Sequence, residues 1–285
     1  MTVRDRASIG VGVLALALIV LATQLPAIGA GGLLHPMRSR VRRVPPAGCQ
    51  DTTYQGDGVS LKGWYCRTDV GRRGTLIYLH GIADNRTSVA GIVERFRRRG
   101  FDVVAYDSRA HGESDGDICT YGFYEKRDLS LVLDALEDGP IVVVGTSLGA
   151  AVAVQGAAVD SRISAVIAAE IFSDLRTIAA ERAPFFFTAA AIEEAIRLAE
   201  RRGRFQIQAV SPSLAASKVK APVLVIHGAA DRDTPPDHSR RVFEALPGAK
   251  RLILVPAAGH NESLRGTVWD EIERWIAVAL SSRTN

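Results

Sequence analysis

The feature that most constrains the fold is a strand that leads directly into a serine-centred turn and a helix of small residues. Ile141-Val-Val-Val144 contains four consecutive β-branched residues, which is typical of a strand buried on both faces of a parallel sheet. Residues 145–149 read Gly-Thr-Ser-Leu-Gly, and residues 150–158 are mostly small and apolar, which predicts a closely packed helix. This order predicts an α/β fold whose sharp turn presents Ser147 at the sheet edge.

The Gly-x-Ser-x-Gly pattern around Ser147 suits an activated nucleophile. Glycine at each side tolerates the crowding of a tight turn, and the strained backbone holds the hydroxyl away from the sheet. The helix behind offers free N–H groups and the positive end of its dipole to an oxyanion. A helix N-cap serine is the alternative, and the strand–turn–helix context favours the nucleophile.

Composition excludes several classes of function. The 285 residues are 47% hydrophobic, enough for one sizeable core, and the formal net charge of +4 is spread over scattered arginines. We therefore expect no nucleic-acid partner. The chain has three cysteines, no C-x-x-C and no H-E-x-x-H, so we expect neither a disulfide scaffold, nor a metal, nor another cofactor.

An uncharged apolar run extends from Ile9 to Leu25. As a helix it would span about 25 Å, the short end of a transmembrane length. Residues 1–34 are predicted to be a membrane anchor or signal segment, and residues 35–48 a basic, proline-containing linker. A retained anchor is favoured over a cleaved signal peptide because the cleavage site is poor. A core helix is disfavoured because Pro26 and a glycine cluster follow at once.

The side of the membrane stays open. Four arginines follow the run, at positions 38, 40, 42 and 43, and outnumber Arg4 and Arg6, which argues for a cytoplasmic domain. A basic start followed by an apolar run argues instead for export. We expect a membrane-associated protein of undetermined orientation.

Residues 49–66 alternate around Gly56-Asp57-Gly58, which is a hairpin signal. A two-residue turn at positions 57 and 58 places Cys49 opposite Cys66 in a non-hydrogen-bonded pair, close enough for a disulfide. Two unrelated buried thiols are the alternative. A disulfide would favour an exported domain.

Strands and helices alternate through the rest of the chain, but residues 173–220 interrupt the alternation with two helical stretches. We predict that this insertion is a short cap. Its run Phe185-Phe186-Phe187 would suit an acyl group if it faced a catalytic serine, and ordinary packing of the cap on the body is the alternative. The last helix, within residues 262–281, has one apolar side.

A nucleophilic serine needs a base, and the base needs an orienting acid. Asp231 and His260 follow two successive strands after Ser147, so all three are expected at the carboxyl edge of one sheet. Other polar groups invite a catalytic interpretation, but structural roles are favoured for them: His80, Asp107, Arg109 and His111.

At these residues the chain resembles the α/β-hydrolase family over roughly residues 50 to 280, and it looks most like the serine aminopeptidase-like and monoacylglycerol-lipase-like branch. The matching motifs are His80-Gly81, Asp107-Ser-Arg-Ala-His111-Gly-Glu-Ser, Gly145-Thr-Ser147-Leu-Gly149, His227-Gly-Ala-Ala-Asp231 and Gly259-His260. The resemblance implies a mostly parallel eight-stranded sheet with helices on both faces, an N-terminal hairpin and a short cap. The hydrolase domain is expected at 49–285.

The resemblance also implies the roles of the site residues. Ser147 would be the nucleophile, His260 the general base and Asp231 its orienting acid, with an oxyanion hole from the backbone N–H groups of Ile82 and Leu148. Asp231 follows His-Gly at the family's spacing, and two other carboxylates remain alternative acids: Asp233 and Glu170.

We therefore expect a cofactor-free serine hydrolase that cleaves carboxylic esters, including acyl lipids or thioesters, at a membrane surface. A peptidase or amidase of the serine aminopeptidase type is the alternative within enzymes. A non-catalytic binding module on the same fold is the alternative outside them.

Overall fold

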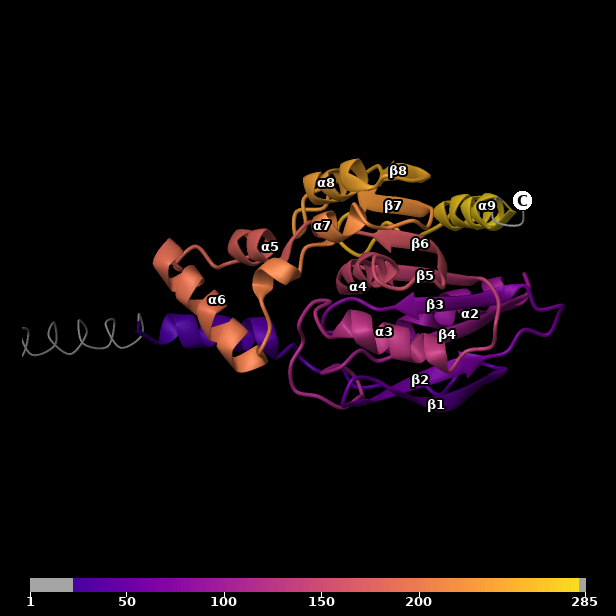
Figure 1. The fold of residues 1–285 in the computed structure, drawn as a ribbon, viewed down its shortest axis with the longest axis horizontal. Helices are drawn as coiled ribbons and strands as arrows, with labels where there is room; N and C mark the ends of the chain where they lie inside the picture. The colour runs from indigo at the N-terminus through magenta and orange to yellow at the C-terminus, as the bar shows by residue number, and fades with distance from the viewer. Residues whose placement is uncertain (1–22, 282–285) are drawn as a thin grey trace, which may run out of the picture.

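A computed structural model describes residues 23–281 of the chain (Figure 1). Its centre is one eight-stranded sheet with the order β1-β2-β4-β3-β5-β6-β7-β8. The strands are β1 (Cys49–Gln55), β2 (Ser60–Cys66), β3 (Gly74–Leu79), β4 (Phe101–Tyr106), β5 (Ile141–Thr146), β6 (Ile163–Ala169), β7 (Val223–Gly228) and β8 (Lys250–Val255). Strands β3 to β8 are parallel and the β1–β2 hairpin joins β4 antiparallel, as the sequence predicts.

The N-terminal hairpin has the predicted register. The Gly56 N–H donates to the Val59 carbonyl at 2.8 Å, which closes the turn. Cys49 pairs with Cys66, and a disulfide joins them across Cα atoms 3.9 Å apart. Of the two alternatives for these cysteines, the structure contains the disulfide, which links the edge strand β1 to the rest of the sheet.

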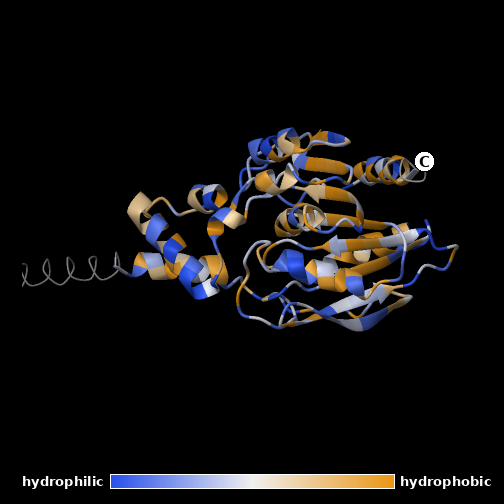
Figure 2. Ribbon diagram, in the orientation of Figure 1, coloured by the Kyte–Doolittle hydropathy of each residue, from blue (hydrophilic) through white to orange (hydrophobic). Residues whose placement is uncertain are grey.

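Helices cover both faces of the sheet. Successive residues of a strand point to opposite faces, so they pack in two buried clusters, one on each face. Leu76 packs with α2 (Ala90–Arg97) and α9 (Val268–Ser281) on one face, while its neighbour Ile77 packs on the other. That second face carries α3 (Glu125–Asp134), α4 (Leu148–Ala157) and α8 (Asp237–Ala245). A 3₁₀ turn, η1 (Arg86–Val89), leads into α2. The apolar strands and α4 stand out in Figure 2.

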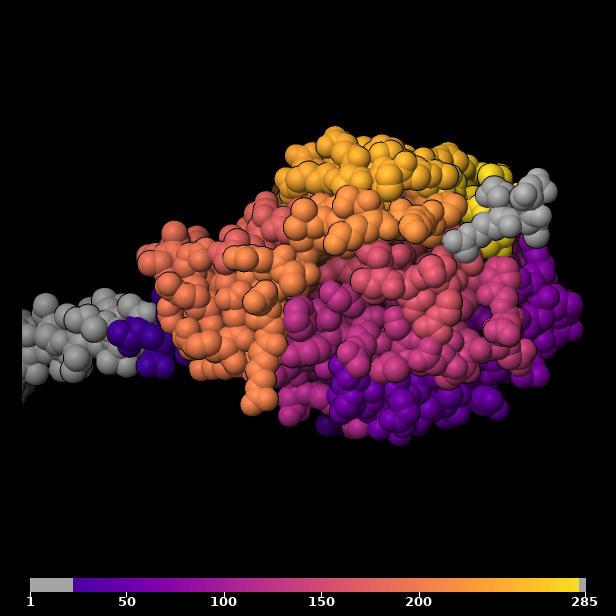
Figure 3. Space-filling view, viewed as in Figure 1, coloured from indigo at the N-terminus to yellow at the C-terminus, as the bar shows by residue number. Residues whose placement is uncertain are grey.

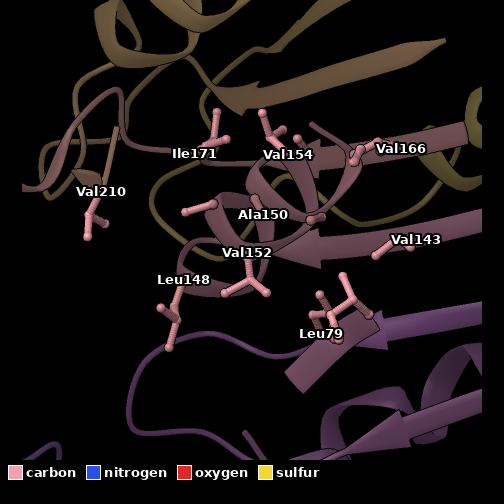
Figure 4. Packing of buried hydrophobic residues seen from close by; sticks show 14 of the residues in the cluster. Leu79, Val143, Leu148, Ala150, Val152, Val154, Val166, Ile171 and Val210 are labelled. Atoms are coloured by element: carbon pink, nitrogen blue, oxygen red, sulfur yellow. The ribbon is translucent and has the colours of Figure 1, made fainter. Parts of the chain in front are cut away.

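Every residue of helix α4 is buried. Figure 4 shows Ala150, Val152 and Val154 of this helix among aliphatic side chains from β3, β5 and β6. Because α4 begins directly after Ser147 and is closely packed, the turn that holds Ser147 is fixed in position.

The insertion between β6 and β7 contains α5 (Leu175–Glu181), α6 (Ala189–Gly203), a 3₁₀ turn η2 (Ile207–Ala209) and α7 (Pro212–Ala216). Helix α7 packs on α4 and α8, so it belongs to the body. Helices α5 and α6 project from the body as a lobe, and we use the word cap for this pair (Figures 1 and 3).

The first described residues form a helix that packs against the cap. Residues 23–34 are helical and cross α6, and the helix continues through the glycines at 29, 31 and 32 (Figure 1). Gly29 permits the close approach: a Cβ there would lie 3.0 Å from both Ala195 Cβ and a ring carbon of Phe187. Ala30 and Leu34 are fully buried. Residues 23–34 therefore form part of the folded molecule, where small residues let two helices meet.

Residues 1–22, which hold most of the predicted anchor or signal segment, lie outside the described residues. Within residues 23–281, no helix combines the length and apolar character that crossing a bilayer requires.

Candidate active site

Ser147 occupies a strained turn between β5 and α4. Its backbone has φ 51° and ψ −110°, a conformation rare for a residue with a side chain. The two flanking glycines are required by close packing: a Cβ on Gly145 would lie 2.2 Å from the Gly149 carbonyl oxygen, and one on Gly149 would lie 2.1 Å from the Leu79 carbonyl oxygen. The Gly-x-Ser-x-Gly pattern is thus explained by contact distances around the turn.

Ser147, His260 and Asp231 form one continuous chain of hydrogen bonds. His260 Nε2 lies 3.1 Å from Ser147 Oγ, and His260 Nδ1 lies 2.7 Å from Asp231 Oδ2. A carboxylate can only accept, so Nδ1 donates to Asp231 and Nε2 keeps a lone pair for the serine hydroxyl. The three predicted residues meet at the carboxyl edge of the sheet, after β5, β7 and β8.

Asp231 is held in its ionised form. Its Oδ1 accepts the backbone N–H groups of Asp233 and Thr234, each at 2.9 Å. His227 Nε2 lies 3.2 Å from Oδ2 and donates to the Thr234 carbonyl at 2.7 Å. Burial alone would raise the pKa of Asp231, but the hydrogen bonds from His227, His260 and Thr234 outweigh it and hold this pKa well below its usual value.

The alternative acids occupy different positions. Glu170 is buried, and its carboxylate accepts the Ser263 N–H at 2.9 Å and the Thr146 hydroxyl at 3.1 Å. It therefore connects the turn at Ser147 to the loop that carries His260. The Asp233 side chain is exposed. Of the three carboxylates considered, Asp231 is the one hydrogen-bonded to His260.

The two backbone N–H groups predicted to form an oxyanion hole are available. Among the hydrogen bonds of residues 23–281, neither the Ile82 N–H nor the Leu148 N–H donates to a protein acceptor. Leu148 is the first residue of α4, where an N–H has no partner within the helix. A Cβ on Gly81, next to Ile82, would lie 3.7 Å from Ser147 Cβ, so this loop adjoins the serine.

The other polar groups have structural contacts, as predicted. The Ser108 N–H donates to His80 Nε2 at 3.0 Å, and Arg109 forms a two-point ion pair with Asp128, both distances being 2.7 Å. The Arg86 guanidinium pairs with Asp107. Burial, with repulsion from the neighbouring His80, lowers the pKa of His111 to about 4. In the described part of the chain, no group of His, Cys, Asp and Glu is arranged to hold a metal ion.

A pocket of about 610 Å³ adjoins His260 and is also lined by Ile82, Asp233 and a residue that sequence reasoning missed, Arg182. The Arg182 guanidinium donates to the Asp233 carbonyl at 2.9 Å and to the Thr234 hydroxyl at 2.6 Å. A cap residue thus supports the loop of Asp231. No sequence pattern predicts this role of Arg182, because the contact depends on where α5 packs against the loop after β7.

The three phenylalanines predicted to line a substrate pocket do not lie together in one site. Phe185 is 100% exposed and Phe186 is 55% exposed, so neither lies in an enclosed site. Phe187 lines a separate apolar cavity between the cap and the N-terminal helix. The three residues lie in a turn before α6, where the Phe187 N–H donates to the Pro184 carbonyl, so their side chains point in different directions.

Comparisons with known proteins agree with this fold. Residues 74–211 match the family described as alpha/beta hydrolase fold. Uncharacterized protein YqkD of Bacillus subtilis strain 168 is 31% identical over 66% of this chain and 65% of its own length. Uncharacterized protein Rv2307c of Mycobacterium tuberculosis is 30% identical over 82% of this chain and 80% of its own length. The Pyrococcus furiosus esterase Pf2001 superposes with a TM-score of 0.66 at 22% identity, covering 86% of this chain and 96% of the esterase.

The chain belongs to the alpha/beta hydrolase family. Its fold is that of a hydrolase, with a mostly parallel sheet and a strained serine turn after β5.

Proposed function

We propose that the protein is a serine hydrolase that cleaves carboxylic esters through an acyl-enzyme. The observation that carries this proposal is the hydrogen-bonded chain Asp231–His260–Ser147. The serine lies on a strained turn beside two backbone N–H groups that have no acceptor within residues 23–281. A serine hydroxyl is a weak nucleophile by itself, and this arrangement supplies both the base and its orienting acid.

The geometry defines the steps. His260 Nε2 removes the hydroxyl proton as Ser147 Oγ bonds to the ester carbonyl carbon, and the carbonyl oxygen becomes an oxyanion that accepts from Leu148 and Ile82 N–H. His260 then gives its proton to the alkoxy oxygen, the C–O bond breaks, and an alcohol leaves. Water then repeats the sequence: His260 takes a proton from it, and its oxygen attacks the acyl carbon. The bond from the acyl carbon to Ser147 Oγ breaks, His260 returns the proton to Ser147 Oγ, and the carboxylic acid leaves.

Asp231 has an electrostatic and an orienting role in both halves of the reaction. Its low pKa keeps it ionised, so it stabilises the His260 imidazolium that forms in each transition state. Its contacts to two backbone N–H groups hold the carboxylate still, which keeps Nε2 directed at Ser147.

Apolar acyl esters, including lipids and thioesters, are the proposed substrates within this class. An apolar cavity between the cap and the N-terminal helix supports this choice over peptides, because a buried peptide would need hydrogen-bond partners for its backbone. The apolar run from Ile9 to Leu25 supports attachment of the enzyme to a membrane, where such substrates are concentrated.

The test is hydrolysis of p-nitrophenyl butyrate by the full chain and two serine variants. Ser147→Ala is expected to reduce kcat by about a thousandfold or more, because it removes the nucleophile. Ser173→Ala is the control: this buried serine also lies 2.9 Å from a histidine nitrogen, of His238, and its loss should leave the rate unchanged. Turnover by Ser147→Ala near that of the unmodified protein would refute the proposal.

A further inference from the structure

Residues 35–48 connect the N-terminal helix to β1, and their first part is fixed to the loop after β4 (Figure 1). The Arg38 guanidinium donates to the carbonyls of Ser114 and Gly116 in that loop, at 2.7 Å for Ser114. These contacts hold the next residue, Ser39, in a defined position, although it belongs to neither a helix nor a strand.

Ser39 contacts the loop after β3, which carries the Ile82 N–H predicted for the oxyanion hole. The Ser39 hydroxyl donates to the Ala83 carbonyl. The Ser39 carbonyl accepts the side-chain amide of Asn85 at 3.2 Å. The oxygen of the same side chain, Asn85 Oδ1, accepts the Thr87 N–H at 3.0 Å at the start of η1. Ser39 therefore holds this loop at two points.

The loop needs such support because Ala83 has a left-handed backbone, with φ 57°. A residue with a side chain keeps this conformation only when its surroundings enforce it. The bond that closes the turn is long, since the Asp84 N–H lies 3.4 Å from the Gly81 carbonyl oxygen. The hydrogen bond from Ser39 thus stabilises a turn that is weakly held by its own contacts.

The contacts form a continuous chain from Ser39 to the Ile82 N–H. A peptide group holds the carbonyl of one residue and the N–H of the next in one rigid plane. The Ala83 carbonyl, which Ser39 holds, shares a peptide group with the Asp84 N–H. That N–H meets the Gly81 carbonyl, which shares a peptide group with the Ile82 N–H. Fixing the first plane therefore orients the second, and successive hydrogen bonds strengthen one another.

We propose that Ser39 is a positioning residue for the oxyanion hole: its hydroxyl aims the Ile82 N–H at the carbonyl oxygen of the substrate. The inference rests on the proposed function, in which that oxygen becomes an oxyanion at Ser147. A Cβ on Gly81 would lie 3.7 Å from Ser147 Cβ, so the peptide group that is oriented lies next to the nucleophile. The segment between the N-terminal helix and β1 then contributes to catalysis.

The test compares Ser39→Ala, Ser39→Thr and Ser217→Ala in the full chain. Alanine removes the hydroxyl of Ser39, and threonine keeps it. Ser217→Ala is the matched control, because the Ser217 hydroxyl also donates to a backbone carbonyl, that of Leu214 at 2.8 Å, at the end of α7 and outside the loop after β3.

Each protein is assayed for hydrolysis of p-nitrophenyl butyrate and for inhibition by pentyl trifluoromethyl ketone, whose adduct with Ser147 is an oxyanion. Ser39→Ala should lower kcat about fivefold to tenfold, the worth of one hydrogen bond, with KM unchanged. Acylation and deacylation both pass through an oxyanion, so kcat falls whichever step is slower. The Ki of the ketone should rise by the same factor. Ser39→Thr and Ser217→Ala should match the unmodified protein in both measurements.

Other results overturn the inference. If kcat and Ki of Ser39→Ala equal those of Ser217→Ala, or if only KM or the melting temperature changes, Ser39 does not position the oxyanion hole. A loss in Ser39→Thr as large as that in Ser39→Ala would show that the hydroxyl is not the group responsible. Turnover that depends on Ser147 keeps the hydrolase in these cases, whereas turnover independent of Ser147 overturns the proposed function and the inference together.

Discussion

The protein contains two Ser–His–carboxylate clusters with nearly the same distances. In one, His260 lies 3.1 Å from Ser147 Oγ and 2.7 Å from Asp231. In the other, His238 lies 2.9 Å from Ser173 Oγ and 2.7 Å from Glu181. Distances alone would make both of them catalytic.

Their surroundings differ. The Nδ1 lone pair of His238 already receives the Ser173 N–H at 3.1 Å and the Arg241 guanidinium at 3.0 Å, and the Ser173 hydroxyl lies 3.0 Å from Asp174. Ser173 is fully buried. This cluster is saturated with partners and joins the cap to α8, so it can hold structure but cannot transfer a proton to a substrate.

The Ser147 cluster has a strained turn and a neighbouring pocket, and in the described part of the chain the N–H groups of Leu148 and Ile82 beside it have no acceptor. On the proposed function, unfilled hydrogen-bonding capacity beside the serine matters for its activation as much as its distance to a histidine.

Substituting the carboxylate of each cluster should give the largest difference in kcat between the two clusters. Asp231→Asn is expected to reduce kcat by about a thousandfold to ten-thousandfold, because an amide no longer fixes the His260 tautomer. Glu181→Gln should leave kcat unchanged and lower only the melting temperature. Asp233→Asn should have no effect on kcat. The comparison fails if steady-state kinetics show Asp233→Asn or Glu181→Gln to be more damaging than Asp231→Asn.

Acid should weaken the fold outside both clusters, at His111. Its folded-state pKa of about 4 is below the unfolded value of about 6.5, so the unfolded state takes up the proton first as the pH falls. The unfolding equilibrium constant should therefore rise on the order of a hundredfold between pH 6.5 and pH 4. Urea titrations of His111→Gln should show a flatter pH dependence. If the free energy of unfolding of His111→Gln depends on pH as steeply as that of the unmodified protein, groups other than His111 cause the acid sensitivity.

Glu170→Gln should have an intermediate effect on catalysis. The carboxylate contacts Ser263 in the His260 loop and Thr146 beside the nucleophile, and an amide can satisfy only one of these groups as an acceptor. We expect kcat to fall about tenfold, the loss of one good hydrogen bond, with KM unchanged. A thousandfold fall, as large as that of Asp231→Asn, would instead indicate that Glu170 is the acid.

Arg182→Lys should have the smallest effect. Lysine keeps the charge but cannot contact both the Asp233 carbonyl and the Thr234 hydroxyl in the same geometry. A fall in kcat/KM of about threefold to tenfold is expected, the loss of one surface-side hydrogen bond. Arg232→Lys is the control, since its exposed side chain lines the same pocket. An equal fall in kcat/KM for both variants would show that Arg182 has no special role in supporting the Asp231 loop.

Local sequence determined much of this architecture. The β-branched run of β5, the glycines at 145 and 149, and the strand ends before Asp231 and His260 predict the serine turn and the chain order of the site. The Cys49–Cys66 register also follows from counting, because a two-residue turn leaves one way to pair the strands.

What escaped prediction depends on contacts between distant segments. Arg182 meets Asp233, and Glu181 meets His238, only because the cap docks on the loop after β7. The N-terminal helix packs on α6 because Gly29 has no side chain, a consequence visible only once the partner helix is known. No periodicity within either segment encodes such pairings.

The most direct test of the central claim is intact-mass analysis of the full chain after exposure to a fluorophosphonate, beside Ser147→Ala and Ser173→Ala. Our account predicts a single adduct on the unmodified protein, a single adduct on Ser173→Ala, and none on Ser147→Ala. An adduct that persists in Ser147→Ala, or none on the folded unmodified protein, would contradict the assignment of Ser147 as the activated nucleophile.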